Sequence, residues 1–316
     1  MKPSVARRAT PLGTAVLLLL MAVSSQVLHA QDGGLAFLRI GTNAEAGALG
    51  DAGVATNGDV FAAYWNPAGL AAPRTNAVAL SQLLWVADVR AYALAARFRA
   101  GPQGGLGVFF TSLDAGDFEA RQGPSEEPDG LFGAQFLNLS VAYGRALGPL
   151  NVGVTAKYLV ERIFTNEATG YAFDLGAQLR LLSGSLNLGA AIQNVGEMTD
   201  LSDEATPLPR LVRAGVAVEP FQILAQDDGT PLLDLAVVAD VSHVFDDDAT
   251  RVHVGTAATL LDLIVARAGL ITNDDLRGPT FGLGLVYAPF QFDYAYLPFD
   301  EGFADTGHVL TLRYQW

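Results

Sequence analysis

The C-terminal segment from His308 to Trp316 most constrains the fold of this chain. Its side chains alternate between an apolar set (Leu310, Leu312, Tyr314, Trp316) and a polar set (Thr311, Arg313, Gln315). Successive side chains of a strand point to opposite faces, so this strand suits a wall between lipid and a polar lumen. A soluble edge strand can show the same alternation. The terminal aromatic residue favours an outer-membrane β-barrel, in which we expect Tyr314 and Trp316 to form the membrane-assembly signal.

The N-terminus has the features of a secretory signal peptide. A basic start precedes an apolar run from Ala15 to Val23, and small residues lead to a cleavage site that we place after Ala30. Leu28 occupies the third position before that site, where signal peptides usually have a small residue. Cleavage after Ser25 is therefore the alternative. The apolar run is too short to span a bilayer as a helix. The chain has no cysteine, which excludes a lipid-anchored N-terminus and disulfide bonds.

Composition indicates strands rather than transmembrane helices. Half of the residues are hydrophobic and 34 are glycine, yet no apolar stretch after the signal is long enough for a transmembrane helix. Apolar residues recur instead with period two in short segments bounded by Gly, Pro or Asp. We predict fourteen strands, at residues 75–84, 89–100, 104–112, 135–145, 150–163, 171–182, 186–194, 210–221, 232–245, 251–260, 263–272, 279–287, 290–298 and 308–316.

The connections between these segments support a barrel. Those after even-numbered strands are short, with one exception, and those after odd-numbered strands are longer. Bacterial outer-membrane barrels have an even number of strands, short periplasmic turns and long external loops. The predicted fold class is therefore all-β, a transmembrane antiparallel β-barrel of about 14 strands. We expect it to be monomeric and to lie in the cell outer membrane with both termini in the periplasm.

The net charge of −14 is concentrated in the predicted external loops. Segments 113–134 and 195–209 carry many of these carboxylates, and Asp246, Asp247 and Asp248 form an acidic run. Such a surface repels phosphates, so we expect no nucleic-acid partner. The acidic run lacks the spaced ligands and turn glycine of a dedicated calcium loop, which favours a solvated tip over a metal site.

The alternation of side chains along each predicted strand, here called strand parity, places a set of charged side chains in the lumen. One interpretation is a lumen whose ion pairs keep polar groups partnered, and the alternative is a ladder that lines a substrate path. The charges are balanced when Glu161 and Glu219 are included, so they predict no ion selectivity. The lumen-facing candidates are Arg97, Lys157, Asp174, Arg180, Arg213, Asp234, Asp240, Arg267, Asp293 and Arg313.

The segment before the first strand carries the most specific motifs. Residues 37–41, 44–47, 49–53 and 64–70, the last reading Tyr-Trp-Asn-Pro-Ala-Gly-Leu, resemble the N-terminal signature of the PorV/PorQ family, whose members are similar to FadL outer-membrane transporters. Residues 267–270, 280–285 and 292–296 resemble the closing strands of the same family. The resemblance extends from about residue 35 to the end and is weakest in the middle.

The resemblance implies a hatch inside the barrel. It divides the chain into a signal peptide (1–30), an N-terminal hatch or plug segment (31–73) and the barrel (74–316). It places Asn66, Pro67, Ala68 and Gly69 in or at the lumen as the hatch motif. Small residues let the backbone pack closely there, and Asn66 before Pro67 favours a turn. The alternative is that the motif is a turn between plug and wall without ligand chemistry.

Three classes of function remain. The resemblance implies a type IX secretion component that docks exported proteins for surface attachment, with secretion-system proteins and cargo as partners. The alternative is a FadL-like transporter whose partner is a hydrophobic small molecule. The acidic external loops favour protein docking over solute capture. An enzyme is disfavoured because parity directs only His253 of the mature histidines inward, and no nucleophile and base pair is evident. We predict no cofactor and no metal.

Overall fold

The computed structural model describes residues 35–71, 73, 75–85, 89–120, 128–202, 205–224, 232–274, 276–299 and 306–316. These residues belong to one compact unit, Gly33–Trp316. The predicted signal peptide lies outside the described residues, as do parts of the predicted external loops, including residues 121–127 and 300–305.

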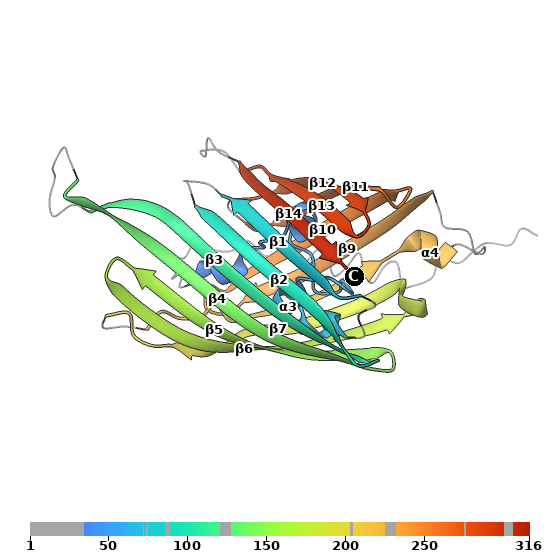
Figure 1. Ribbon diagram of the computed structural model, residues 1–316, viewed down its shortest axis with the longest axis horizontal. Coiled ribbons are helices and arrows are strands. Elements are labelled where there is room, and N and C mark those ends of the chain that lie inside the picture. Colours follow the sequence, from blue (N-terminus) through green and yellow to red (C-terminus); the bar gives the residue numbers. More distant parts are fainter. Residues whose placement is uncertain are drawn as a thin grey trace, which may run out of the picture. The chain divides into compact units, whose positions relative to one another are not determined.

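Fourteen antiparallel strands form a closed barrel in which β1 pairs with β14 and every other strand pairs with its sequence neighbours (Figure 1). The predicted fold class is thus confirmed. The strands are β1 (Ala77–Leu84), β2 (Arg90–Ala100), β3 (Gly104–Ala120), β4 (Gly130–Leu147), β5 (Leu150–Ile163), β6 (Asn166–Leu181), β7 (Leu186–Met198), β8 (Leu211–Val218), β9 (Leu233–Val244), β10 (Ala249–Leu260), β11 (Ile264–Thr272), β12 (Pro279–Tyr287), β13 (Phe290–Leu297) and β14 (Gly307–Gln315).

The outer face of the wall is apolar along most strands. In β12, Phe281, Leu283, Leu285 and Tyr287 are exposed, whereas Gly282 and Gly284 between them are buried. Exposed large apolar side chains in this alternation are what a lipid-facing wall requires. No helix within the described ranges has the length and apolar character needed to span a bilayer.

The two rims of the barrel differ. The turn rim carries the connections after even-numbered strands and the C-terminus, and the loop rim carries the connections after odd-numbered strands. The turn-rim connections are tight except 219–232, which contains α4 (Pro220–Leu224), while β6 and β7 are joined through η3 (Leu182–Gly184). Trp316 and Asn76 exchange backbone hydrogen bonds of 3.0 Å at the turn rim. Exposed Tyr314 and Trp316 stack there, with ring centroids 5.4 Å apart.

The predicted external loop from Leu113 to Ala134 is mostly strand, which corrects the sequence-based boundary. β3 continues to Ala120 and β4 begins at Gly130, with a register shift between Asp114 and Asp117. β7 likewise continues to Met198. Exposed Asp114 and Glu197 interrupt the apolar alternation near these ends, but strand pairing needs only backbone hydrogen bonds and continues beyond it. Leu113 and Ala134 are buried and do not belong to an acidic docking loop.

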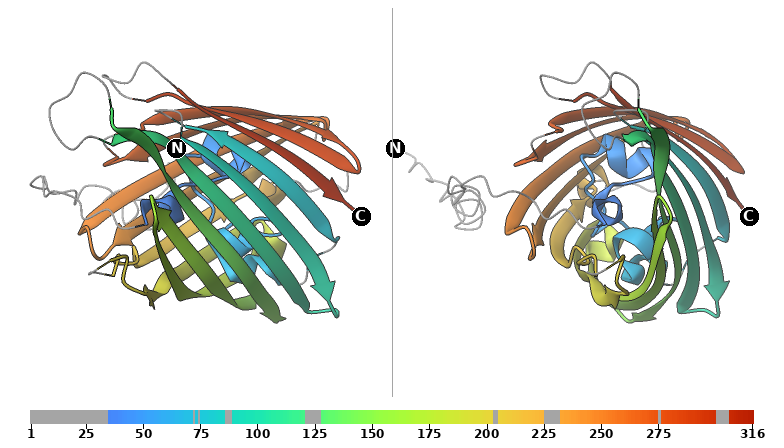
Figure 2. Two further views of the ribbon diagram at one scale, coloured as in Figure 1. Left: turned by 60° about the vertical axis from the view of Figure 1, so that its left-hand side comes forward. Right: turned by 90° about the vertical axis from the view of Figure 1, so that its left-hand side faces the viewer.

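The N-terminal segment lies inside the barrel as a hatch (Figure 2). Its elements are short: η1 (Ala36–Arg39), α2 (Ala44–Ala48), α3 (Ala62–Trp65) and η2 (Pro67–Leu70). Phe61, Trp65 and Leu70 are fully buried, and the wall beside them consists of Phe109 and otherwise small residues. Those small residues are Ala77, Ala79, Ala93, Ala95 and Ala142. Small side chains are needed because the hatch fills this level of the lumen.

Candidate functional site: the lumen and its hatch

The hatch motif packs on a row of glycines in the wall. The row consists of Gly105, Gly144, Gly153 and Gly176, which pair directly from β3 to β6. A Cβ atom at any of the four would overlap hatch atoms, which come from Leu70, Pro67 or Asn66. Only glycine allows the hatch backbone to approach the wall this closely.

Asn66 joins the hatch to the wall through its side-chain amide. Its Nδ2 donates to the carbonyl oxygen of Val54 at 2.7 Å and lies 3.2 Å from that of Ala177 on β6. Its Oδ1 accepts from the backbone N–H of Ala68 at 3.1 Å and caps η2. Pro67 occupies the first position of η2, where its missing N–H costs nothing. Asn66, Pro67, Ala68 and Gly69 are all buried, and these contacts are those of a turn between plug and wall.

We predict that Gly176→Val weakens the docking of the hatch. The added side chain would collide with Asn66 and Pro67, and overpacking of this kind costs about 1–3 kcal/mol or more. Gly130→Val is the matched control, because a Cβ there meets nothing within 4 Å. Urea unfolding of the refolded barrel, followed by tryptophan fluorescence, measures both variants. Equal midpoints for the two would contradict the tight contact at Gly176.

The predicted lumen-facing charges lie on the inner side of the wall. Arg97, Lys157, Asp174, Arg213, Asp240, Arg267 and Asp293 are buried, and Arg180, Asp234 and Arg313 are half-buried. Two cross-strand ion pairs form between them, each with an N–O distance of 2.8 Å: Lys157 with Asp174, and Arg267 with Asp293. Glu161 is buried as well and accepts from the Thr206 hydroxyl at 2.6 Å.

Other lumen arginines find their partners on the hatch. Glu45 on α2 accepts from Arg313 at 2.7 Å, and its other oxygen lies 3.8 Å from Arg267. Asp59 lies 3.6 Å from Arg313. Burial alone would raise the pKa of Glu45, but Arg267 and Arg313 lower it to about 2. Glu45 is therefore ionised at neutral pH and ties the hatch to β11 and β14.

The remaining buried charges hold the hatch backbone. Arg97 donates to the carbonyl oxygen of Gly58, and Arg213 donates to that of Asp51 at 2.8 Å. Asp240 accepts from the backbone N–H groups of Gly53 and Val54 at 2.7 and 2.9 Å. These side chains are thus occupied by the hatch, and they do not form a continuous ladder along an open path.

Two predicted lumen residues lie apart from this network, near the turn rim. Asp234 accepts from Gln222 of α4 at 3.3 Å. Arg180 lies beside η3, where a Cβ on Gly184 would sit 3.2 Å from its guanidinium. Among the described residues, neither forms a hydrogen bond or ion pair with the hatch, so the structure does not bring them together with the other eight.

His253 has a partner that the sequence did not reveal. Its Nε2 lies 2.8 Å from the Ser242 hydroxyl, and its Nδ1 lies 2.7 Å from the carbonyl oxygen of Gly50. Both side chains are buried beneath the hatch. Because Nδ1 of His253 contacts the carbonyl oxygen of Gly50 in the hatch, the His253–Ser242 pair helps to fix the position of the hatch.

The loop rim is tied to the hatch by a second ionic network. Arg39 pairs with Asp247, and Asp51 pairs with Arg277 at 2.8 Å. Asp274 lies 3.4 Å from Arg277 and 3.3 Å from Arg251. Burial would raise the pKa of Asp274, but Arg277 and Arg251 hold it below its usual value. Sequence reasoning missed Arg39, Glu45 and Asp51, because no local pattern marks a hatch residue as the partner of a distant strand.

The acidic run at residues 246–248 takes part in these rim contacts. Asp246 pairs with Arg210 at 2.8 Å, and that hydrogen bond lowers the pKa of the carboxyl group. Asp247 pairs with Arg39 of the hatch. Within the part of the chain that is described, no group of three or more potential ligands could hold a metal ion.

An apolar cluster fills the lumen toward the loop rim. The hatch contributes Leu35, Phe37, Leu38, Ala44 and Ala48, all of which are less than 9% exposed. Phe136 of β4 packs against the cluster, and its ring stacks on that of Phe37. Leu208 of the connection between β7 and β8 is also buried here, and the buried strand residues are Leu83, Ala91, Leu113, Leu159, Ala168, Ala172, Met198, Ala295, Leu297 and Val309. This level of the lumen is mainly apolar, with buried Glu161 paired in register with Phe136 and Ala168 at its edge, whereas the charged pairs with Glu45 and Asp59 lie nearer the turn rim.

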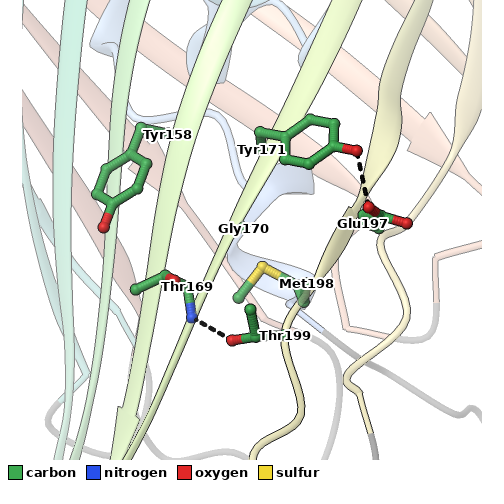
Figure 3. Close-up of a pocket in the computed structure, with 7 residues that line it drawn as sticks. All are labelled: Tyr158, Thr169, Gly170, Tyr171, Glu197, Met198 and Thr199. Atoms are coloured by element: carbon green, nitrogen blue, oxygen red, sulfur yellow. Dashed lines mark hydrogen bonds between the residues drawn. The ribbon is translucent and has the colours of Figure 1, made fainter.

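A pocket of about 200 Å³ lies on the outer wall beside this cluster. Tyr158, Thr169, Gly170, Tyr171, Glu197, Met198 and Thr199 line it (Figure 3). Met198 belongs both to the pocket and to the apolar cluster, and it pairs with Gly170, which has no side chain. Met198 is therefore in contact with both the outer pocket and the apolar interior.

The fold and the lumen define the class: a transmembrane β-barrel plugged by its own N-terminal segment. Among solved structures, the toluene transporter TbuX of Ralstonia pickettii is similar, with a TM-score of 0.59 and 13% identity over 87% of this chain and 98% of that one. A mutant of TodX, a monoaromatic hydrocarbon channel, has a TM-score of 0.57 and 12% identity over the same shares of the two chains. The chain therefore has the barrel fold of these proteins.

A Pseudomonas aeruginosa FadL homologue aligns with a TM-score of 0.48 and 12% identity, over 87% of this chain and 98% of that one. No protein-family model and no curated protein matches the sequence. The resemblance to the PorV/PorQ family stays a prediction from the motifs.

Proposed function

We propose that the protein carries small hydrophobic molecules across the outer membrane, with its loop rim facing outward and its turn rim facing the periplasm. The observation that carries the proposal is the apolar cluster, in which wall residues of several strands enclose five buried apolar side chains of the hatch. A path for ions or polar solutes would gain nothing from such a lining, since burying polar groups without partners costs free energy. A hydrophobic solute gains free energy in proportion to the apolar area it buries there.

Two further features support the same function. TbuX and TodX, whose fold this chain shares, are described as a toluene transporter and a monoaromatic hydrocarbon channel. The wall pocket at Met198 supplies an apolar surface on the lipid side of the cluster. We infer that a solute passes between the cluster and the surroundings where the wall is thinnest, and we expect no catalytic step.

A role in type IX secretion, with secretion-system proteins and cargo as partners, stays the second candidate on the strength of the sequence motifs. The structure gives less support to this role than the sequence did. Leu113 and Ala134 are buried in the barrel, and Asp246, Asp247 and Asp274 are engaged in ion pairs at the loop rim. Less of the acidic surface is therefore free for docking among the described residues.

The test combines a gene deletion with two measurements. Loss of the protein should slow the uptake of radiolabelled toluene and leave surface-attached secreted proteins unchanged. Wild-type protein should restore uptake, whereas Leu159→Gln should restore it poorly, because it places a polar group in the apolar cluster. Leu232→Gln is the matched control, since Leu232 is 73% exposed. Normal uptake together with lost surface attachment would contradict solute transport and favour secretion.

A further inference from the structure

We propose that the wall pocket at Met198 holds one acyl chain of an outer-leaflet lipid, and that Arg162 binds a phosphate group of the same lipid. Lipid A has this chemistry, since it carries both acyl chains and phosphate groups. The proposal rests on the proposed function in one respect, namely that the loop rim faces outward. A solute that leaves the barrel at Met198 would exchange places with this acyl chain.

The wall pocket lies on the lipid-facing side of the barrel near the loop rim, where β7 ends at Met198. Tyr158 and Tyr171 pair in register between β5 and β6, and they are 53% and 49% exposed. Leu159 and Ala172, which follow them along the two strands, are buried in the apolar cluster. The tyrosines therefore face outward. Aromatic residues form girdles where acyl chains meet headgroups, so the pocket lies at the depth where an acyl chain begins.

The polar groups around the pocket are already paired with one another (Figure 3). The backbone N–H of Thr169 donates to the Thr199 hydroxyl at 2.9 Å, and the N–H of Thr199 donates to the carbonyl oxygen of Thr169 at 2.7 Å. The Tyr171 hydroxyl is 2.7 Å from Glu197. A polar ligand would compete with these hydrogen bonds. An acyl chain would leave them intact and gain free energy by burying apolar surface against Met198.

A cation lies between the pocket and the loop rim on the same face of the wall. Arg162 follows Tyr158 by four residues on β5, which places the two residues about 13 Å apart along the strand. The Arg162 side chain is 51% exposed, and its Nε and Nη2 atoms contact Glu167 at 3.0 and 2.5 Å. Its Nη1 atom is only at the limit of a hydrogen bond to Gln135, at 3.5 Å. The guanidinium therefore retains donors for a phosphate, which arginine binds through several N–H groups at once.

The test titrates lipid A into the detergent-solubilised mature protein and counts bound lipids by native mass spectrometry. The wild-type protein should bind one lipid A more tightly than the dephosphorylated form of that lipid. Thr199→Phe should weaken the binding of both forms about tenfold, because the added ring fills the pocket and displaces the equivalent of roughly two buried methylene groups.

Two controls separate pocket filling from other effects of this substitution. Thr199→Val removes the same hydroxyl without filling the pocket and should bind lipid A as the wild type does. Thr256→Phe adds the same ring at an exposed position of β10, away from the pocket, and should also leave binding unchanged. Heat-modifiable migration in gels shows that each variant is folded. An unchanged affinity in Thr199→Phe, as expected if a solute or another protein covers the pocket instead, would overturn the proposal.

A second pair of variants tests the phosphate contact with effects of opposite sign. Arg162→Gln should lower the affinity for lipid A about fivefold and leave the dephosphorylated form unaffected, because a cation near the membrane surface attracts anionic lipid. Glu167→Gln removes the competing carboxylate and should raise the affinity for lipid A about twofold. Arg145→Gln, at an exposed position of β4 near the turn rim, is the matched control and should change neither. Equal effects of Arg162→Gln on both forms of the lipid would contradict a phosphate contact.

The outcomes also separate this proposal from the proposed function. If the variants shift lipid binding as expected but the gene deletion leaves toluene uptake normal, the lipid site stands and solute transport is wrong. If the deletion slows uptake but Thr199→Phe binds lipid A as the wild type does, transport stands and the lipid site is wrong.

Discussion

Replacing Lys157 with methionine is expected to lower the free energy of unfolding by about 3–5 kcal/mol, the usual cost of removing one partner of a buried ion pair. Lys157 lies 2.8 Å from Asp174, and the two side chains are 2% and 0% exposed. Lys157 also donates to Asn194 at 2.7 Å. Without the ammonium group, Asp174 keeps the hydrogen bond from the backbone N–H of Asn194 but has no cation beside it.

Arg162→Met on the same strand is the matched control. Arg162 pairs with Glu167, but these side chains are 51% and 47% exposed, so the loss should be at most about 1 kcal/mol. The double variant Lys157→Met with Asp174→Asn should recover much of the stability, because the uncompensated charge is gone. Urea unfolding of barrels refolded into vesicles gives all the values. A Lys157→Met midpoint no lower than that of Arg162→Met would show that the buried pair contributes little.

The second large effect is expected at the lipid-facing surface. Leu283 is 59% exposed near the middle of β12, and Leu283→Arg should cost about 2–4 kcal/mol if the outer face meets the bilayer midplane. Tyr287→Arg, on the same face at the end of the strand, should cost about 0–1 kcal/mol, because the penalty falls toward the interface. The difference between the free energies of unfolding of the two variants shows how much deeper position 283 lies in the membrane than position 287. Equal costs at both positions would contradict a membrane-spanning β12.

The lumen-facing neighbour Gly282 is not a neutral control for this experiment. A Cβ there would overlap the Ala48 side chain of the hatch and lie 2.8 Å from the carbonyl oxygen of Tyr294. Arginine at Gly282 should therefore also destabilise the barrel, for a steric reason rather than a solvation reason. Strand parity alone predicts a polar, roomy lumen at this position, and the hatch reverses that expectation.

The preference between the two leading functions changes once the lumen is known. The sequence favoured protein docking, because segment 113–134 reads as an acidic external loop. In the structure much of this segment belongs to β3 and β4, and Leu113 joins the apolar cluster with Leu35 and Phe37. A buried apolar cluster inside the barrel supports the proposed passage of a hydrophobic solute, and docking on an outer surface does not require it.

The charged residues show what strand parity predicts and what it does not. It directs Arg267, Asp293 and Arg313 inward, and all three lie on the inner side of the wall. It does not reveal that Arg313 pairs with Glu45, which lies 268 positions earlier in the chain. An alternation with period two reports which face a residue occupies, but it carries no signal for its partner.

The sequence by itself determined the number of strands, the side of the wall on which residues within the predicted strands lie, and the rim that has tight turns. These properties are local, because lipid on one face imposes the alternation within each strand and glycine, proline or aspartate ends it. The tertiary structure decided what fills the lumen, which hatch atoms meet the glycines of β3 to β6, and how Phe37 comes to lie on Phe136. Those contacts join residues far apart in the chain, and they exist only once the barrel has closed around the hatch.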